Sequence, residues 1–116
     1  MDDSMTFQQV IDRANEIIER YEKIEGKPWG AEGAVIELAK QVGELSKLIM
    51  VKEGFYFADR AQMHQGYEIS DKKMADELAD ILRCIIRLAK HYNLDLLEAD
   101  TQACKEDDEV LKSKGV

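Results

Sequence analysis

The sequence has little of several features that would suggest a function at once. It contains two cysteines, Cys84 and Cys104, and neither lies in a Cys-x-x-Cys or Cys/His cluster, which argues against a zinc site. Its longest uncharged apolar runs, such as residues 48–51, are far too short to span a bilayer. Positive charge is also scarce, because 24 acidic and 16 basic side chains give a net charge of −8. Since nucleic acids and anionic membranes are bound by basic surfaces, we expect neither as a partner.

The length of the chain and its first residues set its expected organisation. The 116 residues predict a single domain over positions 1–116. Residues 1–4 have neither the basic region nor the apolar core of a signal peptide, so we expect a cytoplasmic protein. A chain of this size builds only a small core, and we expect self-association, as a homodimer or homotetramer, to complete it.

Apolar residues recur at helical spacing in four segments, and no segment shows the alternation typical of a strand. The pattern predicts an all-α fold with helices over about residues 6–24, 31–52, 71–91 and 96–112. Thr6, Ser70 and Asp95 have the side chains that cap helix N-termini. Asn93 is a suitable stop for the third helix. We expect the second and third helices to form the central antiparallel pair.

A long connector separates these two central helices, at about residues 53–69. Connectors of this length without a periodic pattern are uncommon in compact domains and often have a function. The alternative interpretation is a short additional helix over residues 58–64 whose aromatic side chains pack on the bundle.

Acidic side chains lie at the edge of the apolar stripe on both central helices. Glu77 and Asp80 are three residues apart, which places them on one helix face with about 5–6 Å between their Cβ atoms. On the second helix, Glu37, Gln41 and Glu44 follow one line at spacings of four and three. Carboxylates at a core boundary need partners, because they are costly to bury alone. A hard cation such as Mg²⁺ between the two helices would satisfy them.

The other interpretation of these acidic positions is an ordinary solvated helix flank. Basic residues stand at helical spacing from them and would pair with them on the surface. These residues are Lys40, Lys47, Lys73 and Arg87. Spacing alone does not separate the two interpretations.

Three short motifs together resemble the MazG-like, all-α nucleoside triphosphate pyrophosphohydrolases. They are residues 42–45 (VGEL), 76–82 (DELADIL) and 93–96 (NLDL), and the resemblance extends over about residues 30–110. It implies a four-helix MazG-like bundle, completed by dimerisation. It also implies a Mg²⁺-dependent enzyme, with Mn²⁺ as a possible substitute, that hydrolyses a nucleoside triphosphate to the monophosphate and pyrophosphate.

The resemblance also implies which residues form the site. Glu44, Glu77 and Asp80 match the family's metal ligands, and Glu44 is the carboxylate we expect to act in catalysis. The family's remaining glutamate falls on Gln41, which offers a carbonyl oxygen but no charge. Glu37, one turn upstream on the same line, is the candidate substitute.

The expected substrate contacts lie outside this acidic set. Lys47 and Lys105 are candidates to contact phosphate, although residues 106–109 beside Lys105 are all acidic. Trp29 either stacks against the base or closes one end of the bundle as a core residue. Gln41 and the acidic tail favour an alternative function, a non-catalytic helical dimer that binds a nucleotide or a protein partner. A third possibility is a helical interaction module whose carboxylates are surface residues.

Overall fold

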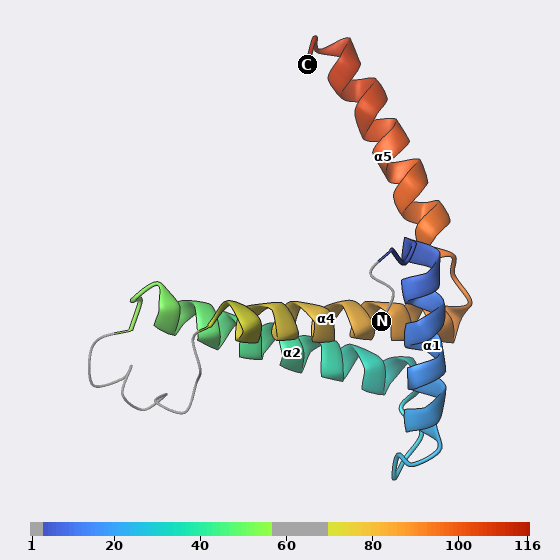
Figure 1. Ribbon diagram of the computed structural model, residues 1–116, viewed down its shortest axis with the longest axis vertical. Helices are drawn as coiled ribbons and strands as arrows, with labels where there is room; N and C mark the ends of the chain where they lie inside the picture. Colours follow the sequence, from blue (N-terminus) through green and yellow to red (C-terminus); the bar gives the residue numbers. More distant parts are fainter. Residues whose placement is uncertain (1–3, 57–69) are drawn as a thin grey trace.

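The computed structural model describes residues 4–56 and 70–116 of the chain. Within these ranges it has four helices and no strand, which confirms the all-α prediction (Figure 1). The helices are α1 (Phe7–Glu22), α2 (Gly30–Lys52), α4 (Asp71–Tyr92) and α5 (Leu96–Ser113). Most of the connector between α2 and α4 falls outside the described residues, and so does the helix considered over residues 58–64.

Local side-chain caps begin three of the four helices at the predicted residues. The Thr6 hydroxyl accepts a hydrogen bond from the Gln9 amide, and the Gln9 side chain accepts one from the Thr6 amide, which is a complete capping box. The hydroxyl of Ser70 caps α4, and the carboxylate of Asp95 caps α5. Each cap satisfies an amide that the first helical turn leaves without a partner.

Helix α4 contacts both α1 and α2. It runs alongside α2, and α1 crosses it near its C-terminal end (Figure 1). At this crossing, Ile11, Ala14 and Ile18 of α1 pack against Ile86 of α4, and Leu96 at the start of α5 packs against the same cluster.

The contact between α2 and α4 follows a seven-residue register. Ala34, Gln41 and Leu48 recur at this interval on α2, and Glu77 and Cys84 do so on α4. Ala34, Leu48, Glu77 and Cys84 are buried, and Gln41 is half-buried. Seven residues are close to two helical turns, so each set forms a line along its helix. These two lines face the interior, with a carboxylate and an amide among the apolar side chains.

An exposed apolar surface flanks this contact on one side. The residue that follows each core position is large, apolar and solvent-exposed: Val35, Val42, Ile49, Leu78 and Ile85. Consecutive helical residues are about 100° apart, and two antiparallel helices in contact turn these next residues to the same side of the pair. We call these five side chains the apolar face.

The opposite side of the pair is charged. A charged residue follows three positions after four of these core residues. On α2 these are Glu37, after Ala34, and Glu44, after Gln41; on α4 they are Asp80, after Glu77, and Arg87, after Cys84. Three residues turn the helix by about 300°, which places these side chains on the side away from the apolar face. We call these four residues the charged face.

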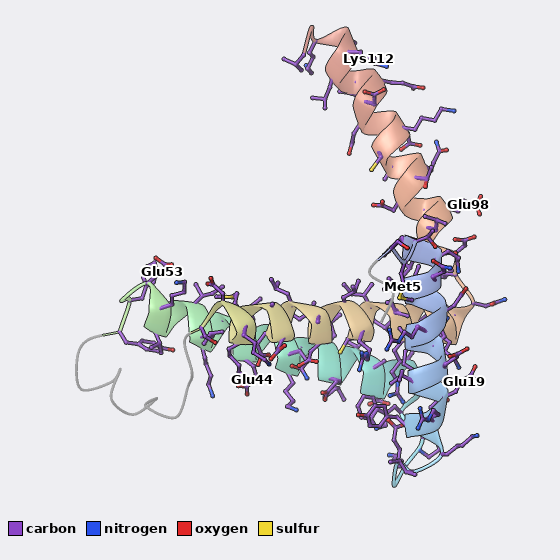
Figure 2. The ribbon with its side chains drawn as sticks, in the orientation of Figure 1. Met5, Glu19, Glu44, Glu53, Glu98 and Lys112 are labelled. Carbon is purple, nitrogen blue, oxygen red and sulfur yellow. The ribbon has the colours of Figure 1, made fainter. Side chains whose placement is uncertain are left out.

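Helix α5 projects away from the other helices and has no buried residue (Figures 1 and 2). The radius of gyration is 18.1 Å, whereas a compact domain of this length has about 13 Å. One copy of the chain is therefore an open structure. The four-helix MazG-like bundle and its completion by a second copy stay predictions.

No helix in the described part of the chain has the length and apolar character needed to cross a membrane.

We expect Ile86→Ala to lower the free energy of unfolding by roughly 2–4 kcal/mol, because it leaves a cavity between α1 and α4. The side chain of Ile86 is only 2% exposed. Urea denaturation, followed by circular dichroism at one fixed protein concentration, measures this change. The matched control is Ile24→Ala at an exposed position, for which we expect about 0.5 kcal/mol or less. Equal effects of the two substitutions would contradict the described core.

Candidate functional site

The carboxylate of Glu77 is buried and only half satisfied. Its residue is 7% exposed, and Oε1 lies 3.0 Å from Nζ of Lys73, one turn earlier on α4. Its second oxygen, Oε2, is buried without a hydrogen-bond partner. A buried carboxylate oxygen without a partner is costly, and such an atom requires a further partner, such as an ordered water molecule or a cation.

The acidic residues around Lys73 raise its pKa. Its hydrogen bond to Glu77 raises the lysine pKa, and the charges of Glu77, Asp76 and Asp80 raise it further, whereas desolvation opposes the shift. Lys73 therefore stays protonated and holds one oxygen of Glu77, while the other oxygen faces the interior.

On α2, Gln41 bonds to the glutamate one turn before it. Its Nε2 donates to Oε1 of Glu37 at 3.0 Å, and Nζ of Lys40 lies 3.6 Å from the same oxygen. This hydrogen bond uses one of the two N–H donors of the amide and leaves its carbonyl oxygen as the atom that can act as a ligand. Glu37 and Gln41 therefore behave as one unit with several oxygen acceptors.

A pocket of about 400 Å³ opens between α1, α2 and α4, and we call it the central pocket. Its polar wall contains Glu37 and Gln41 from α2 with Asp80, Arg83 and Arg87 from α4. Apolar and aromatic side chains complete the wall: Ile18, Tyr21, Ile24 and Trp29. Its volume is in the range of small-molecule sites, and its mixture of apolar walls and a few polar groups is typical of them.

Trp29 is held at the rim of this pocket by a cation. The guanidinium of Arg87 lies over the indole, 4.1 Å from the ring centroid, and donates two hydrogen bonds to Glu25 at 2.9 and 2.6 Å. The side chains of Arg87 and Glu25 are 14% and 13% exposed, so this paired contact is largely shielded from water. A bidentate, shielded pair of this kind fixes both partners and, through Arg87, the indole.

Gly33 makes room for this position of the tryptophan. A Cβ atom at residue 33 would lie 2.6 Å from Cβ of Trp29, which is closer than carbon atoms can approach. A side chain at this position would require Trp29 or the first turn of α2 to shift.

Cys84 lines the same pocket, and the charged residues around it shift the pKa of its thiol. Burial raises the pKa of the thiol, and the carboxylates of Glu37 and Asp80 raise it further, while Arg87 and Lys40 partly oppose the shift. Negative charges from both α2, through Glu37, and α4, through Asp80, therefore act on the same thiol. The raised pKa keeps Cys84 protonated and unreactive near neutral pH.

The structure brings together part of the site expected from the sequence. Trp29, Glu37, Gln41 and Asp80 line the central pocket, and Glu77 is buried one turn before Asp80. Within residues 4–56 and 70–116, no three acidic, histidine or cysteine side chains converge as a ready-made metal site.

The remaining expected residues lie outside the central pocket in one copy of the chain. Glu44 is half-buried midway along α2 (Figure 2). Lys47 is exposed on α2, and Lys105 is exposed on α5, which projects away from the pocket.

Sequence reasoning missed the Arg87–Glu25 pair. The spacing of residues predicts that Arg87 pairs with acidic residues at helical spacing, whereas its partner lies 62 positions away. Glu25 follows the end of α1, where no periodic pattern reports its direction. A local signal for this pair is absent from the sequence.

Comparisons with known family models, curated proteins and solved structures find no match to this chain. The MazG-like resemblance therefore stays a prediction from the motifs.

We expect iodoacetamide to alkylate Cys104 at least about ten times faster than Cys84 at pH 8, because Cys104 is exposed and Cys84 is buried with a raised pKa. Mass spectrometry of the two peptides over time measures both rates. Denaturation in urea is the control and should bring the rates together. A Cys84 that reacts as fast as Cys104 in the folded protein would contradict the described pocket.

Proposed function

We propose that this chain is a Mg²⁺-dependent nucleoside triphosphate pyrophosphohydrolase of the MazG-like type. One observation carries the proposal: the buried Oε2 of Glu77 lacks a partner, one turn before Asp80, which lines the central pocket together with Glu37, Gln41 and Trp29. The donor set, which is carboxylate and amide oxygens only, is the kind that Mg²⁺ and Mn²⁺ prefer.

Glu77, Asp80 and Glu44 would hold the cation, with Glu37 or Gln41 completing the set. When bound, the cation neutralises phosphate charge and orients a water molecule. The side chain of Glu44 then takes a proton from the water that adds to the α-phosphate, and the α–β anhydride bond breaks to release pyrophosphate. Trp29, held by Arg87, offers a flat apolar surface for the base. Lys47 is the proposed phosphate contact. Lys105 could fill this role only from a second copy, because α5 projects away from the central pocket of its own chain.

A second candidate function is supported by the hydrogen bond between Gln41 and Glu37. If that bond persists when substrate is present, both side chains are occupied with each other and the site has too little charge for catalysis. The chain would then bind a nucleotide or a protein partner without hydrolysing it.

We also propose that two or more copies associate through the apolar face, as a homodimer or homotetramer. Five exposed apolar side chains on one side of a helix pair form the kind of surface that pairs of helices bury in four-helix bundles. The charged face lies on the other side, so this association leaves the central pocket open.

The cation site is tested by Mg²⁺ titration of thermal stability. We expect Mg²⁺ at ten times its dissociation constant to stabilise the fold by about 1.4 kcal/mol, which raises the melting temperature by several degrees. Glu77→Gln should remove this gain. Asp76→Asn is the matched control, because Asp76 is exposed on the same helix and pairs with Lys72. If Asp76→Asn also removes the gain, or if no gain occurs, the proposed site is wrong.

Catalysis is tested with a panel of ribo- and deoxyribonucleoside triphosphates in the presence of Mg²⁺ or Mn²⁺. We expect release of pyrophosphate, detected by phosphorus NMR, and a loss of at least about a hundredfold in Glu77→Gln. Gln41→Glu should raise the rate or tighten metal binding, since it restores a charge. Stabilisation by Mg²⁺ without pyrophosphate from any substrate would favour the non-catalytic function.

The self-association is tested by Val42→Glu, which places a charge at the centre of the apolar face. We expect it to dissociate the assembly at concentrations where the unchanged protein remains associated, as measured by sedimentation equilibrium. Ile24→Glu, at an exposed apolar residue outside that face, is the control and should leave the mass unchanged. An unchanged mass for Val42→Glu would rule out the apolar face as the interface.

A further inference from the structure

Helix α5 carries an apolar stripe that its own chain covers only at the first turn. Leu96, Ala103 and Val110 recur at intervals of seven, and Leu111 borders them. Leu96 packs against the core cluster of α1 and α4, whereas Val110 and Leu111 are 53% and 49% exposed. The side of α5 that packs against the core at Leu96 is therefore exposed to solvent along the rest of the helix.

Two carboxylates stand within this apolar stripe. Asp100 and Asp107 lie four residues after Leu96 and Ala103, which places them on the same side of the helix. Asp107 makes no ion pair within the described part of the chain. A helix side that combines apolar residues with two acidic ones fits an apolar surface that contains cations.

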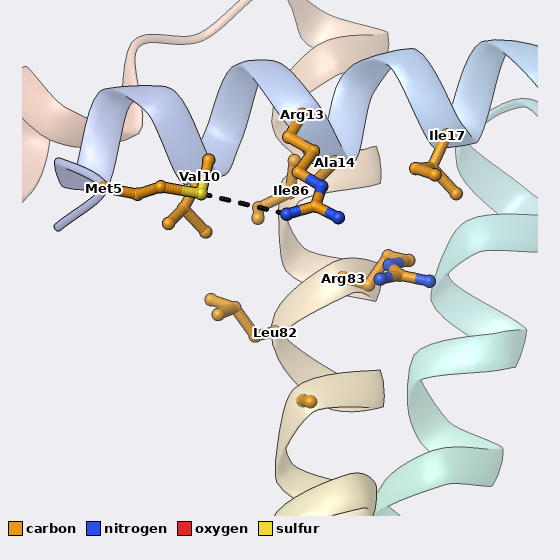
Figure 3. A pocket seen from close by; sticks show the side chains of 9 residues that line it. Met5, Val10, Arg13, Ala14, Ile17, Leu82, Arg83 and Ile86 are labelled. Atoms are coloured by element: carbon orange, nitrogen blue, oxygen red, sulfur yellow. Dashed lines mark hydrogen bonds between the residues drawn. The ribbon is translucent and has the colours of Figure 1, made fainter. Parts of the chain in front are cut away.

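The α1–α4 groove, which borders the central pocket at Arg83, has this complementary character (Figure 3). It encloses about 300 Å³ between α1 and α4, with an apolar lining and two guanidinium groups. Among its residues are Val10, Arg13 and Ile17 of α1 and Leu82, Arg83 and Ile86 of α4. The side chains of Arg13 and Arg83 extend into the space between the helices, where Nη1 of Arg13 lies 3.8 Å from Sδ of Met5.

The α5 of the same copy is directed away from this groove. Asn93 adopts the left-handed conformation at the end of α4, with φ of 54°, and the Leu94 amide donates to the Ala89 carbonyl at 2.8 Å. This C-terminal cap and the Asp95 cap that follows it fix the direction in which α5 leaves. The short turn therefore carries α5 beyond the N-terminal end of α1 (Figure 1).

We propose that α5 of one copy docks in the α1–α4 groove of a second copy, with Asp100 and Asp107 facing Arg13 and Arg83. This inference rests on the self-association included in the proposed function and adds a specific contact to it. The apolar stripe of α5 covers the apolar lining, and the charges of the two sides are opposite. The groove volume is at the lower limit for small-molecule sites, which favours side chains of a docked helix as its occupant.

Crosslinking through Cys104 tests the contact even if a second interface also joins the copies. Cys104 is an exposed free thiol beside the apolar stripe of α5, and Val10→Cys places a second thiol in the groove. Equal amounts of unlabelled and nitrogen-15-labelled Val10→Cys protein are mixed and treated with a short bismaleimide. We expect linked peptides that join residue 10 of one isotope to residue 104 of the other.

Charge exchange then tests which residues meet. We expect Asp107→Arg to lower the yield of this link about fivefold, because it brings like charges together. Adding Arg13→Glu to Asp107→Arg should restore the yield. The matched controls are Glu109→Arg, on the opposite side of α5, and Arg20→Glu, outside the groove on α1. Both should leave the yield unchanged.

The outcomes separate this contact from the proposed function. If sedimentation shows association but no link between copies forms, or if Asp107→Arg leaves its yield unchanged, the docking of α5 is wrong and the self-association stands. If the double variant does not restore the yield, the pairing of Asp107 with Arg13 is wrong. If the unchanged protein is monomeric at all concentrations, both the docking and the self-association are wrong. Pyrophosphate release is measured independently of all three.

Discussion

The double contact of α4, with α2 along one side and with α1 across another, is the constraint on which the other features depend. It places Ile86 in the core with α1 and Cys84 against α2. Asp80 and Arg87, which lie between these two directions on the helix, must then face the space that all three helices enclose. The central pocket is therefore a consequence of how one amphipathic helix satisfies two neighbours.

The α2–α4 pair separates its chemistry by helical register. The residues one position after each residue of the core line form the apolar face, and the residues three positions after four of them form the charged face. Association and ligand binding would therefore use opposite sides of the same two helices. The two polar residues within the core line, Gln41 and Glu77, are the exception to this division. Polar groups in such positions usually reduce stability, and their presence is best explained by the ligand that we propose they bind.

The sequence predicts those parts of the fold and the site that depend on local pattern. Helix limits and the caps at Thr6 and Ser70 follow from spacing and side-chain chemistry within a few residues. The position of Glu77 at the core boundary follows in the same way. The partnerless oxygen of Glu77 could not be predicted, because it depends on how the helices pack around it. The Arg87–Glu25 pair and the direction of α5 could not be predicted either, since one joins residues 62 positions apart and the other is set by the backbone of Asn93.

The place of α4 in the chain also determines when the protein can fold. Its contacts with α1 and α2 are the principal packing between helices in the described residues, and α4 is made after both of them. During synthesis from the N-terminus, α1 and α2 therefore emerge from the ribosome with their apolar sides uncovered. They stay so until residues 71–92 have followed. Until then they lack their main packing partner, and uncovered amphipathic segments are typical sites at which chaperones bind and aggregation begins.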